Sequence, residues 1–191
     1  SEELFPAQAL IILSIPVGIG CCIFPFLPIK AQIFSVLAAI ASVIYPLSKR
    51  FFKAPQFILG FLCFGLTLPV GYFWAEGSND QAALLLYFGH GFWCVFYDSI
   101  YALQDVQDDL KVGVHSLITT LGNYVNHGLF VLSSVSGLFL ISAFYCLDKS
   151  IVWPCCFLFA LYAQIYLLRY NNYQQLFIIN GLLGLLLWLV L

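Results

Sequence analysis

The stretch YDSIYALQDVQDDLKVGVHS, residues 97–116, joins apolar helix-forming residues to four carboxylates. The whole chain of 191 residues holds nine acidic residues, so nearly half of them fall within this window. Charge next to long apolar segments is costly in a membrane and marks functional positions. If the preceding helix continues through the window, Asp98, Asp105 and Asp109 lie on one face, within about 40° of one another.

Two interpretations of this acidic group are open. Asp105 and Asp109 are like charges one helical turn apart, which is mildly destabilising when no cation lies between them. A hard divalent cation such as Mg²⁺ would remove the repulsion, and proteins commonly hold it with one or two carboxylates plus substrate phosphates. Tyr101 lies close to the same face, whereas Asp108 points away from it. The alternative is a solvated acidic helix end that binds nothing.

The composition predicts an integral membrane protein. Hydrophobic residues make up 62% of the chain and charged residues only 8%, whereas soluble domains carry about 25% charged residues. The net charge of −2 gives no indication of nucleic-acid binding. Seven cysteines lie in apolar surroundings without a CxxC spacing. We interpret them as packing residues rather than as disulfide partners or zinc ligands.

Seven charge-free stretches are long enough for membrane helices, each of which needs about 20 mostly apolar residues. They are Leu4–Ile29, Ala31–Ser48, Ala54–Ala75, Gln81–Tyr97, Ser116–Leu147, Ser150 up to but not including Arg169, and Tyr170–Leu191. We expect the fourth helix to continue past Asp98 to the acidic group, and the fifth to begin near Tyr124. The expected fold class is therefore all-α: a bundle of about seven transmembrane helices forming a single domain over residues 1–191.

The connections between these helices predict an orientation in the membrane. With strict alternation, one side holds Lys49, Arg50, Lys53, Lys111 and Arg169, and the other holds Lys30 and Lys149. The positive-inside rule assigns the more basic side to the cytoplasm. The acidic group lies on this same side, so carboxylates and cations converge on one face. An anionic substrate bound together with a metal ion would require this arrangement.

Two segments together resemble the UbiA-type membrane aromatic prenyltransferases. Residues 45–60, YPLSKRFFKAPQFILG, are similar to the family's Y-P-x-x-K-R-x-x-x-x-P-Q-x-x-L-G segment. Residues 97–116 are similar to its second aspartate-rich motif, Y-D-x-x-Y-A-x-x-D-x-x-D-D-x-x-x-G-V-K-S. The resemblance is to the branch that prenylates 4-hydroxybenzoate in ubiquinone biosynthesis. It implies Mg²⁺-dependent transfer of a polyprenyl group from polyprenyl diphosphate to the 4-hydroxybenzoate ring.

The resemblance also implies roles for the acidic residues. Asp105 and Asp109 would be the Mg²⁺ ligands and the main catalytic residues. Asp108 would bind the ion directly or hold its water molecules. Asp98 lies about 10 Å deeper along a continuous helix. It would orient Tyr101, pair with a cation or contact the aromatic acceptor.

Four basic or titratable residues are implied to bind the substrates. Arg50 would hold the carboxylate of 4-hydroxybenzoate, because a guanidinium fork fits it bidentately. Lys49 and Lys111 would contact the diphosphate. His115 stands where the family has lysine, and histidine is only partly charged near neutral pH, so its phosphate contact should weaken as pH rises. From position alone, Lys49 and Arg50 are equally explained as determinants of membrane topology.

The chain also departs from the family pattern. The family has nine transmembrane helices and an earlier motif, N-D-x-x-D-x-x-x-D, which this sequence does not contain. We therefore expect an N-terminally incomplete protein, the C-terminal seven helices, with the remainder absent or supplied by a second chain. The expected location is the lipid bilayer of a bacterial or mitochondrial inner membrane, with the active face toward cytoplasm or matrix. A non-catalytic membrane scaffold and a small transporter are the alternatives, and a transporter would need charges near the bilayer midplane.

Overall fold

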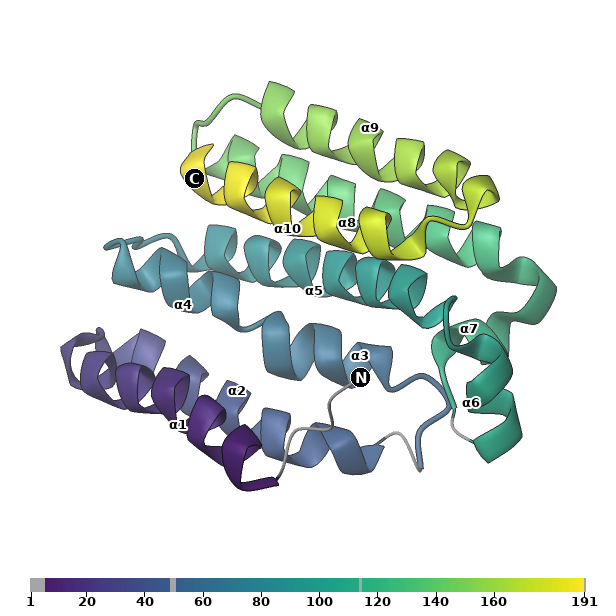
Figure 1. Ribbon diagram of the computed structural model, residues 1–191. Helices are drawn as coiled ribbons and strands as arrows, with labels where there is room; N and C mark the ends of the chain where they lie inside the picture. Colours follow the sequence, from purple (N-terminus) through teal and green to yellow (C-terminus); the bar gives the residue numbers. More distant parts are fainter. Residues whose placement is uncertain (1–5, 49–50, 114, 191) are drawn as a thin grey trace.

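The computed structural model describes residues 6–48, 51–113 and 115–190, and these residues form helices without a β-strand. The helical segments are α1 Pro6–Ile23, α2 Ile29–Ser48, α3 Gln56–Ile58, α4 Thr67–Trp74, α5 Asp80–Ala102, α6 Val106–Val112, α7 Leu117–Leu121, α8 Val125–Cys146, α9 Val152–Leu167 and α10 Tyr173–Val190. The long helices run side by side (Figure 1). The predicted all-α bundle of membrane helices is confirmed.

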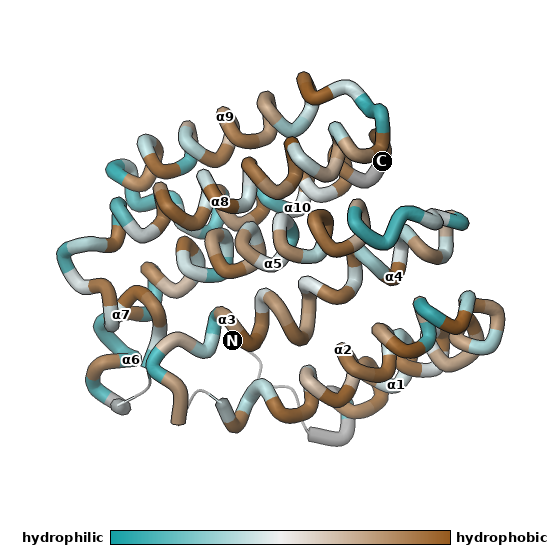
Figure 2. Tube along the Cα trace, turned by 180° about the vertical axis from the view of Figure 1, so that it is seen from behind, coloured by the Kyte–Doolittle hydropathy of each residue, from teal (hydrophilic) through white to brown (hydrophobic). Residues whose placement is uncertain are grey.

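Every charge-free stretch of the sequence contains helical residues. The predicted start of the fifth membrane helix near Tyr124 matches the start of α8 at Val125. Among the described residues, four segments are long and apolar enough to cross a membrane, namely 29–48, 56–74, 117–146 and 152–170. The apolar helices at 10–26 and 173–187 are shorter. Apolar residues run along the helices, while hydrophilic residues gather toward their connections (Figure 2). Many large apolar side chains remain exposed, as expected for a surface that faces lipid.

The helix α5 lies at the centre of the bundle. It packs against α4, α8, α10 and a π-helical stretch, Leu59–Phe64, that links α3 to α4. Glycines permit two of these contacts. A Cβ on Gly89 would lie 2.8 Å from the Leu140 side chain, and one on Gly91 would lie 2.6 Å from the Phe61 ring. Small residues allow membrane helices to approach this closely, so α5 is enclosed by its neighbours.

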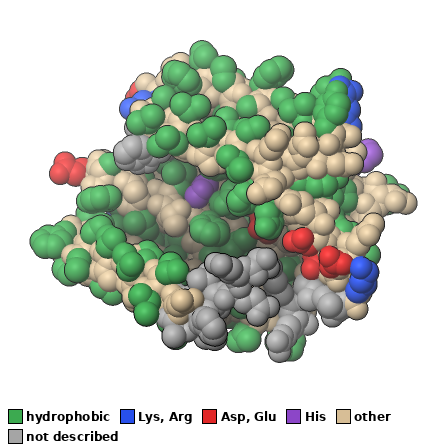
Figure 3. Space-filling model, in the orientation of Figure 1, with side chains coloured by type: hydrophobic (Ala, Val, Ile, Leu, Met, Phe, Trp, Pro, Cys, Tyr) green, Lys and Arg blue, Asp and Glu red, His purple; other side chains and the backbone are tan. Residues whose placement is uncertain are grey.

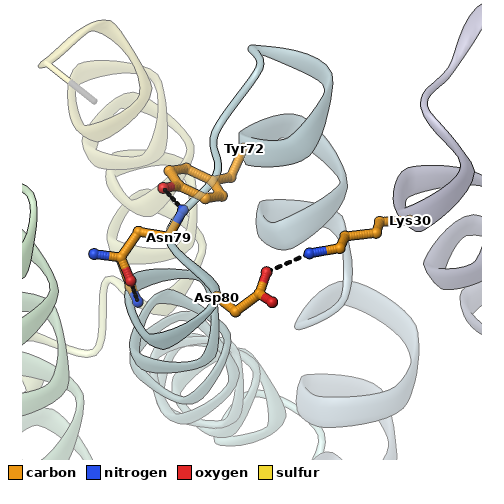
Figure 4. A network of polar contacts seen from close by, with 5 residues as sticks. Lys30, Tyr72, Asn79 and Asp80 are labelled. Atoms are coloured by element: carbon orange, nitrogen blue, oxygen red, sulfur yellow. Dashed lines mark hydrogen bonds and ion pairs between the residues drawn. The ribbon is translucent and has the colours of Figure 1, made fainter.

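Polar contacts join the helices at one end of the bundle (Figure 4). The side-chain oxygen of Asn79 accepts a backbone N–H of the first turn of α5 (3.0 Å), which caps that helix. The Asn79 amide nitrogen also donates to the Cys146 carbonyl at the end of α8 (3.3 Å). The Tyr72 hydroxyl accepts the Asn79 backbone N–H (3.1 Å), and Asp80 forms an ion pair with Lys30 of α2. These contacts hold α2, α4, α5 and α8 together at the end opposite α6 and α7.

The Lys30–Asp80 ion pair is expected to add little stability. Its side chains are 51% and 71% exposed, and exposed ion pairs contribute about 0–1 kcal/mol. Lys30→Ala and Asp80→Ala should each change the unfolding free energy by less than about 1 kcal/mol, with a similarly small coupling in a double-mutant cycle. Thermal unfolding in detergent micelles measures these values. A coupling energy above about 2 kcal/mol would mean that the pair is shielded from water far more than its exposure indicates.

Candidate active site

The fourth helix continues past Asp98 towards the acidic group, as expected, but it ends at Ala102, so the acidic segment is not one continuous helix. A turn at residues 103–105 separates α5 from α6, and its backbone N–H groups bond to carbonyls three residues back. A continuous helix would place the like charges of Asp105 and Asp109 on neighbouring turns of its interior. The break instead puts Asp108 and Asp109 in the first turn of α6, where negative charge interacts favourably with the helix dipole.

The chain then turns back from α6 into α7. Gly113 ends α6 with a left-handed φ of 70°, and its N–H bonds to the Asp109 carbonyl, the C-terminal geometry that glycine adopts most readily. Ser116 caps α7: its hydroxyl accepts the Thr119 N–H (3.1 Å), and the Thr119 hydroxyl accepts the Ser116 N–H (3.0 Å). These reciprocal bonds form a capping box. The reversal leaves His115 next to a well-defined helix start.

A small polar cavity of about 80 Å³ opens where α5, α6 and α7 meet the start of α3. It is lined by Pro55, Gln56, Asp98, Tyr101, Ala102, Asp105, Asp109, His115 and Ser116. Asp98, Asp105 and Asp109 therefore lie around one space despite the helix break. The sequence predicted this proximity from a shared helix face. Figure 3 shows acidic side chains gathered toward this end of a largely apolar molecule.

Two side chains tie the start of α3 to α7. The Gln56 side-chain oxygen accepts the Leu117 N–H (2.8 Å), and the Thr120 hydroxyl donates to the Lys53 carbonyl (2.9 Å). Gln56 was not among the candidate site residues from the sequence. The signal that could have found it is its place in the P-Q pair of residues 45–60. A neutral amide carries no charge that would distinguish it in the sequence, unlike the neighbouring cations.

The predicted site residues divide into three groups. Those that line the cavity are Asp98, Tyr101, Asp105, Asp109 and His115. Asp108 and Lys111 do not line it but form an ion pair with each other (2.9 Å) on the exposed side of α6. Lys49 and Arg50 lie outside the described residues.

The donor set suits a hard divalent cation that also binds a phosphate. In the described ranges, no three Asp, Glu, His or Cys side chains converge closely enough to hold a metal ion unaided. Mg²⁺ does not need such a cage, because it is commonly held by one or two carboxylates and completes its octahedron with water and phosphate oxygens. Asp105 and Asp109 on the cavity wall can supply those two carboxylates.

The bundle also contains a much larger apolar groove. It has a volume of about 890 Å³ and runs between α2 and the α3–α4 segment, from Lys30 and Asp80 at one end to Phe52 and Ile58 at the other. Ile58 of the groove and Gln56 of the polar cavity belong to the same turn of α3, so α3 lies between the two spaces.

Comparison with known proteins gives the chain a family context. The model described as "UbiA prenyltransferase family" matches residues 1–189. The chain is 35% identical over 125 residues to a 4-hydroxybenzoate octaprenyltransferase of Legionella pneumophila (strain Lens), covering 65% of this chain and 44% of that protein. It is 37% identical over 105 residues to the protein of that name from Polynucleobacter necessarius, covering 52% and 36%. The matched part spans less than half the length of these relatives. No solved structure matches the chain.

Proposed function

Because the chain belongs to the UbiA prenyltransferase family, we propose that it acts in transferring a polyprenyl group from polyprenyl diphosphate to the ring of 4-hydroxybenzoate, with Mg²⁺ as cofactor. Relatives named 4-hydroxybenzoate octaprenyltransferase support the choice of substrates. The observation that carries the proposal is the cavity in which Asp98, Asp105 and Asp109 meet at one end of an apolar bundle.

In this proposal the carboxylates of Asp105 and Asp109 hold the metal ion and thereby fix the position of the diphosphate. Bound Mg²⁺ supplies positive charge that stabilises the diphosphate as it leaves the allylic carbon. His115 faces the same cavity and, when protonated, donates a hydrogen bond to a phosphate oxygen. Asp98 lies on α5, deeper than Asp105, where it orients Tyr101 or the phenol of the acceptor.

The remaining predicted residues keep their proposed contacts with the substrates. Arg50 binds the carboxylate of 4-hydroxybenzoate, since its planar fork matches a carboxylate bidentately. Lys49 and Lys111 contact the diphosphate. The exposed pair of Lys111 with Asp108 opens at little energetic cost, which leaves Lys111 available for that contact. Asp108 then serves through water held near the ion rather than from the cavity wall.

The apolar groove receives the prenyl chain in this proposal. Its walls carry side chains such as Ile40, Leu62 and Phe73, which match a hydrocarbon tail by the hydrophobic effect. Ile58 of the groove and Gln56 of the cavity lie within one turn of α3, so the diphosphate end of a chain lying in the groove passes the start of α3 to reach the carboxylates. We also propose a bacterial inner membrane as the location, with the cavity on the cytoplasmic side. The bacterial relatives and the basic residues predicted at this end support that orientation.

The proposal is tested by assaying the protein in lipid vesicles. With polyprenyl diphosphate, labelled 4-hydroxybenzoate and Mg²⁺, it should form a product that extracts into organic solvent and has the mass of prenylated 4-hydroxybenzoate. Chelation with EDTA should abolish the product, and added Mg²⁺ should restore it, because the diphosphate leaves poorly without charge neutralisation. An unchanged rate in EDTA would remove Mg²⁺ from the proposal. A complete lack of product would contradict the function and favour the non-catalytic alternative.

A further inference from the structure

Gln56 joins two parts of the cavity wall that are far apart in sequence. Its side chain is buried, with 4% of its surface exposed, although it lines the polar cavity. Its oxygen accepts the N–H of Leu117, the first residue of α7. N–H groups in the first turn of a helix have no partner inside that helix. Gln56 therefore satisfies a buried backbone donor that α7 cannot satisfy itself.

A second contact reinforces this connection. The Thr120 hydroxyl donates to the Lys53 carbonyl, which ties the next turn of α7 to the segment before α3. Ser116, between the cavity and α7, is 3% exposed and is held by its own capping box with Thr119. The start of α3 and the start of α7 therefore position each other. His115, which directly precedes the cap, faces the cavity from this unit.

We infer that Gln56 is a positioning residue, which holds the His115–Ser116 wall opposite Asp105 and Asp109 and thereby sets the affinity of the cavity for a diphosphate. This inference rests on the proposed function. Gln56 acts through α7 and not by chemistry of its own. Without its bond to Leu117, the start of α7 keeps only the Thr120–Lys53 hydrogen bond to this segment among the described residues, and the wall that carries His115 is held less firmly.

The neutral amide suits this position better than either alternative of similar size. Leucine would leave the buried Leu117 N–H without an acceptor, which is destabilising. Glutamate could accept the same N–H, but it would add a negative charge to a cavity already lined by Asp98, Asp105 and Asp109. Like charges repel an anionic ligand. Of these three side chains, glutamine provides the acceptor without the charge.

The first test measures hydrogen–deuterium exchange of the backbone amides of residues 117–121 in lipid vesicles. Gln56→Leu should speed their exchange about tenfold, because the loss of one buried hydrogen bond raises the population of the locally open state by about that factor. Gln56→Glu should leave it unchanged. The matched control is Ser136→Ala, which removes another buried bond of equal length, from the Ser136 hydroxyl to the Gly89 carbonyl (2.8 Å), between α8 and α5. Unchanged exchange in Gln56→Leu would overturn the inference.

The second test separates positioning from general destabilisation. Gln56→Leu and Gln56→Glu should both weaken binding of geranyl diphosphate with Mg²⁺ and raise the KM for polyprenyl diphosphate about tenfold. The KM for 4-hydroxybenzoate and the kcat should stay close to wild type, and Ser136→Ala should change none of these values. A lower kcat at unchanged KM would show a merely structural role and overturn the inference. If the wild-type protein forms no prenylated product, the proposed function fails, and the exchange result still decides whether Gln56 holds α7.

Discussion

Replacing Asp105 or Asp109 by asparagine is expected to lower the rate of prenyl transfer by at least about a hundredfold, the usual effect of removing a group that stabilises transition-state charge. Asparagine has nearly the same shape but lacks the negative charge that holds Mg²⁺. Neither carboxylate is buried, and removing one of two like charges relieves repulsion, so the fold should persist. Initial rates at saturating substrates, together with circular dichroism of each variant, measure both expectations.

Asp108→Asn tests the weaker, water-mediated role proposed for Asp108 against the direct metal contacts proposed for Asp105 and Asp109. Asp108 lies on the same short helix and also loses one charge, but it pairs with Lys111 outside the cavity. We expect its rate to stay within about fivefold of wild type, since an exposed ion pair contributes little. Near-normal rates for Asp105→Asn and Asp109→Asn would remove them as metal ligands. A hundredfold loss for Asp108→Asn would instead support the direct metal contact that the resemblance implied for this residue.

Asn180→Leu is expected to lower the unfolding free energy by about 2–4 kcal/mol, because it leaves two buried polar groups without partners. The Asn180 side-chain oxygen accepts the Trp93 indole N–H (2.8 Å), and its amide nitrogen donates to the Gln164 side-chain oxygen (2.7 Å). All three residues are buried. They join α5, α9 and α10 inside the bundle, where a buried polar group without a partner is costly. Thermal unfolding in detergent micelles measures the change.

Two further variants check this explanation. The double variant Gln164→Leu with Asn180→Leu should recover part of the lost stability, because replacing both partners by apolar groups removes the unpaired amide. Ser142→Ala removes an exposed hydroxyl that bonds within α8, and it should stay within about 0.5 kcal/mol of wild type. An Asn180→Leu protein as stable as wild type would show that the Trp93–Asn180–Gln164 contacts contribute nothing to the packing of these helices.

The membrane helices could be predicted because hydropathy is a local property of the chain. Long charge-free stretches gave the helical segments closely, including the late start of α8 after the polar residues 116–123. The break between α5 and α6 could not be found in this way, since residues 97–112 have no proline or glycine to mark a helix end. The break follows from the position of Asp105, Asp108 and Asp109, whose charges favour the start of a new helix over the interior of an old one.

The candidate site was predictable only in part, and for a related reason. Asp98, Asp105 and Asp109 stand out because carboxylates are rare in an apolar chain, and the structure places all three around one cavity. Gln56 and Asn180 are neutral amides that resemble many others in the sequence. Their importance depends on partners 61 and 87 residues distant, Leu117 and Trp93, and no local pattern specifies such contacts.

The acidic stretch at residues 97–116 and the long apolar segments around it were enough to determine the membrane class, the helical fold and the identity of the carboxylates. Charge and hydropathy act residue by residue, so they can be read along the chain. Only the tertiary structure decided that Asp98, Asp105 and Asp109 share one cavity despite the break between α5 and α6, and that Gln56 and His115 complete its wall. Those outcomes depend on how α3, α5 and α7 pack together, and that packing is set by hydrogen bonds and close contacts between distant parts of the chain.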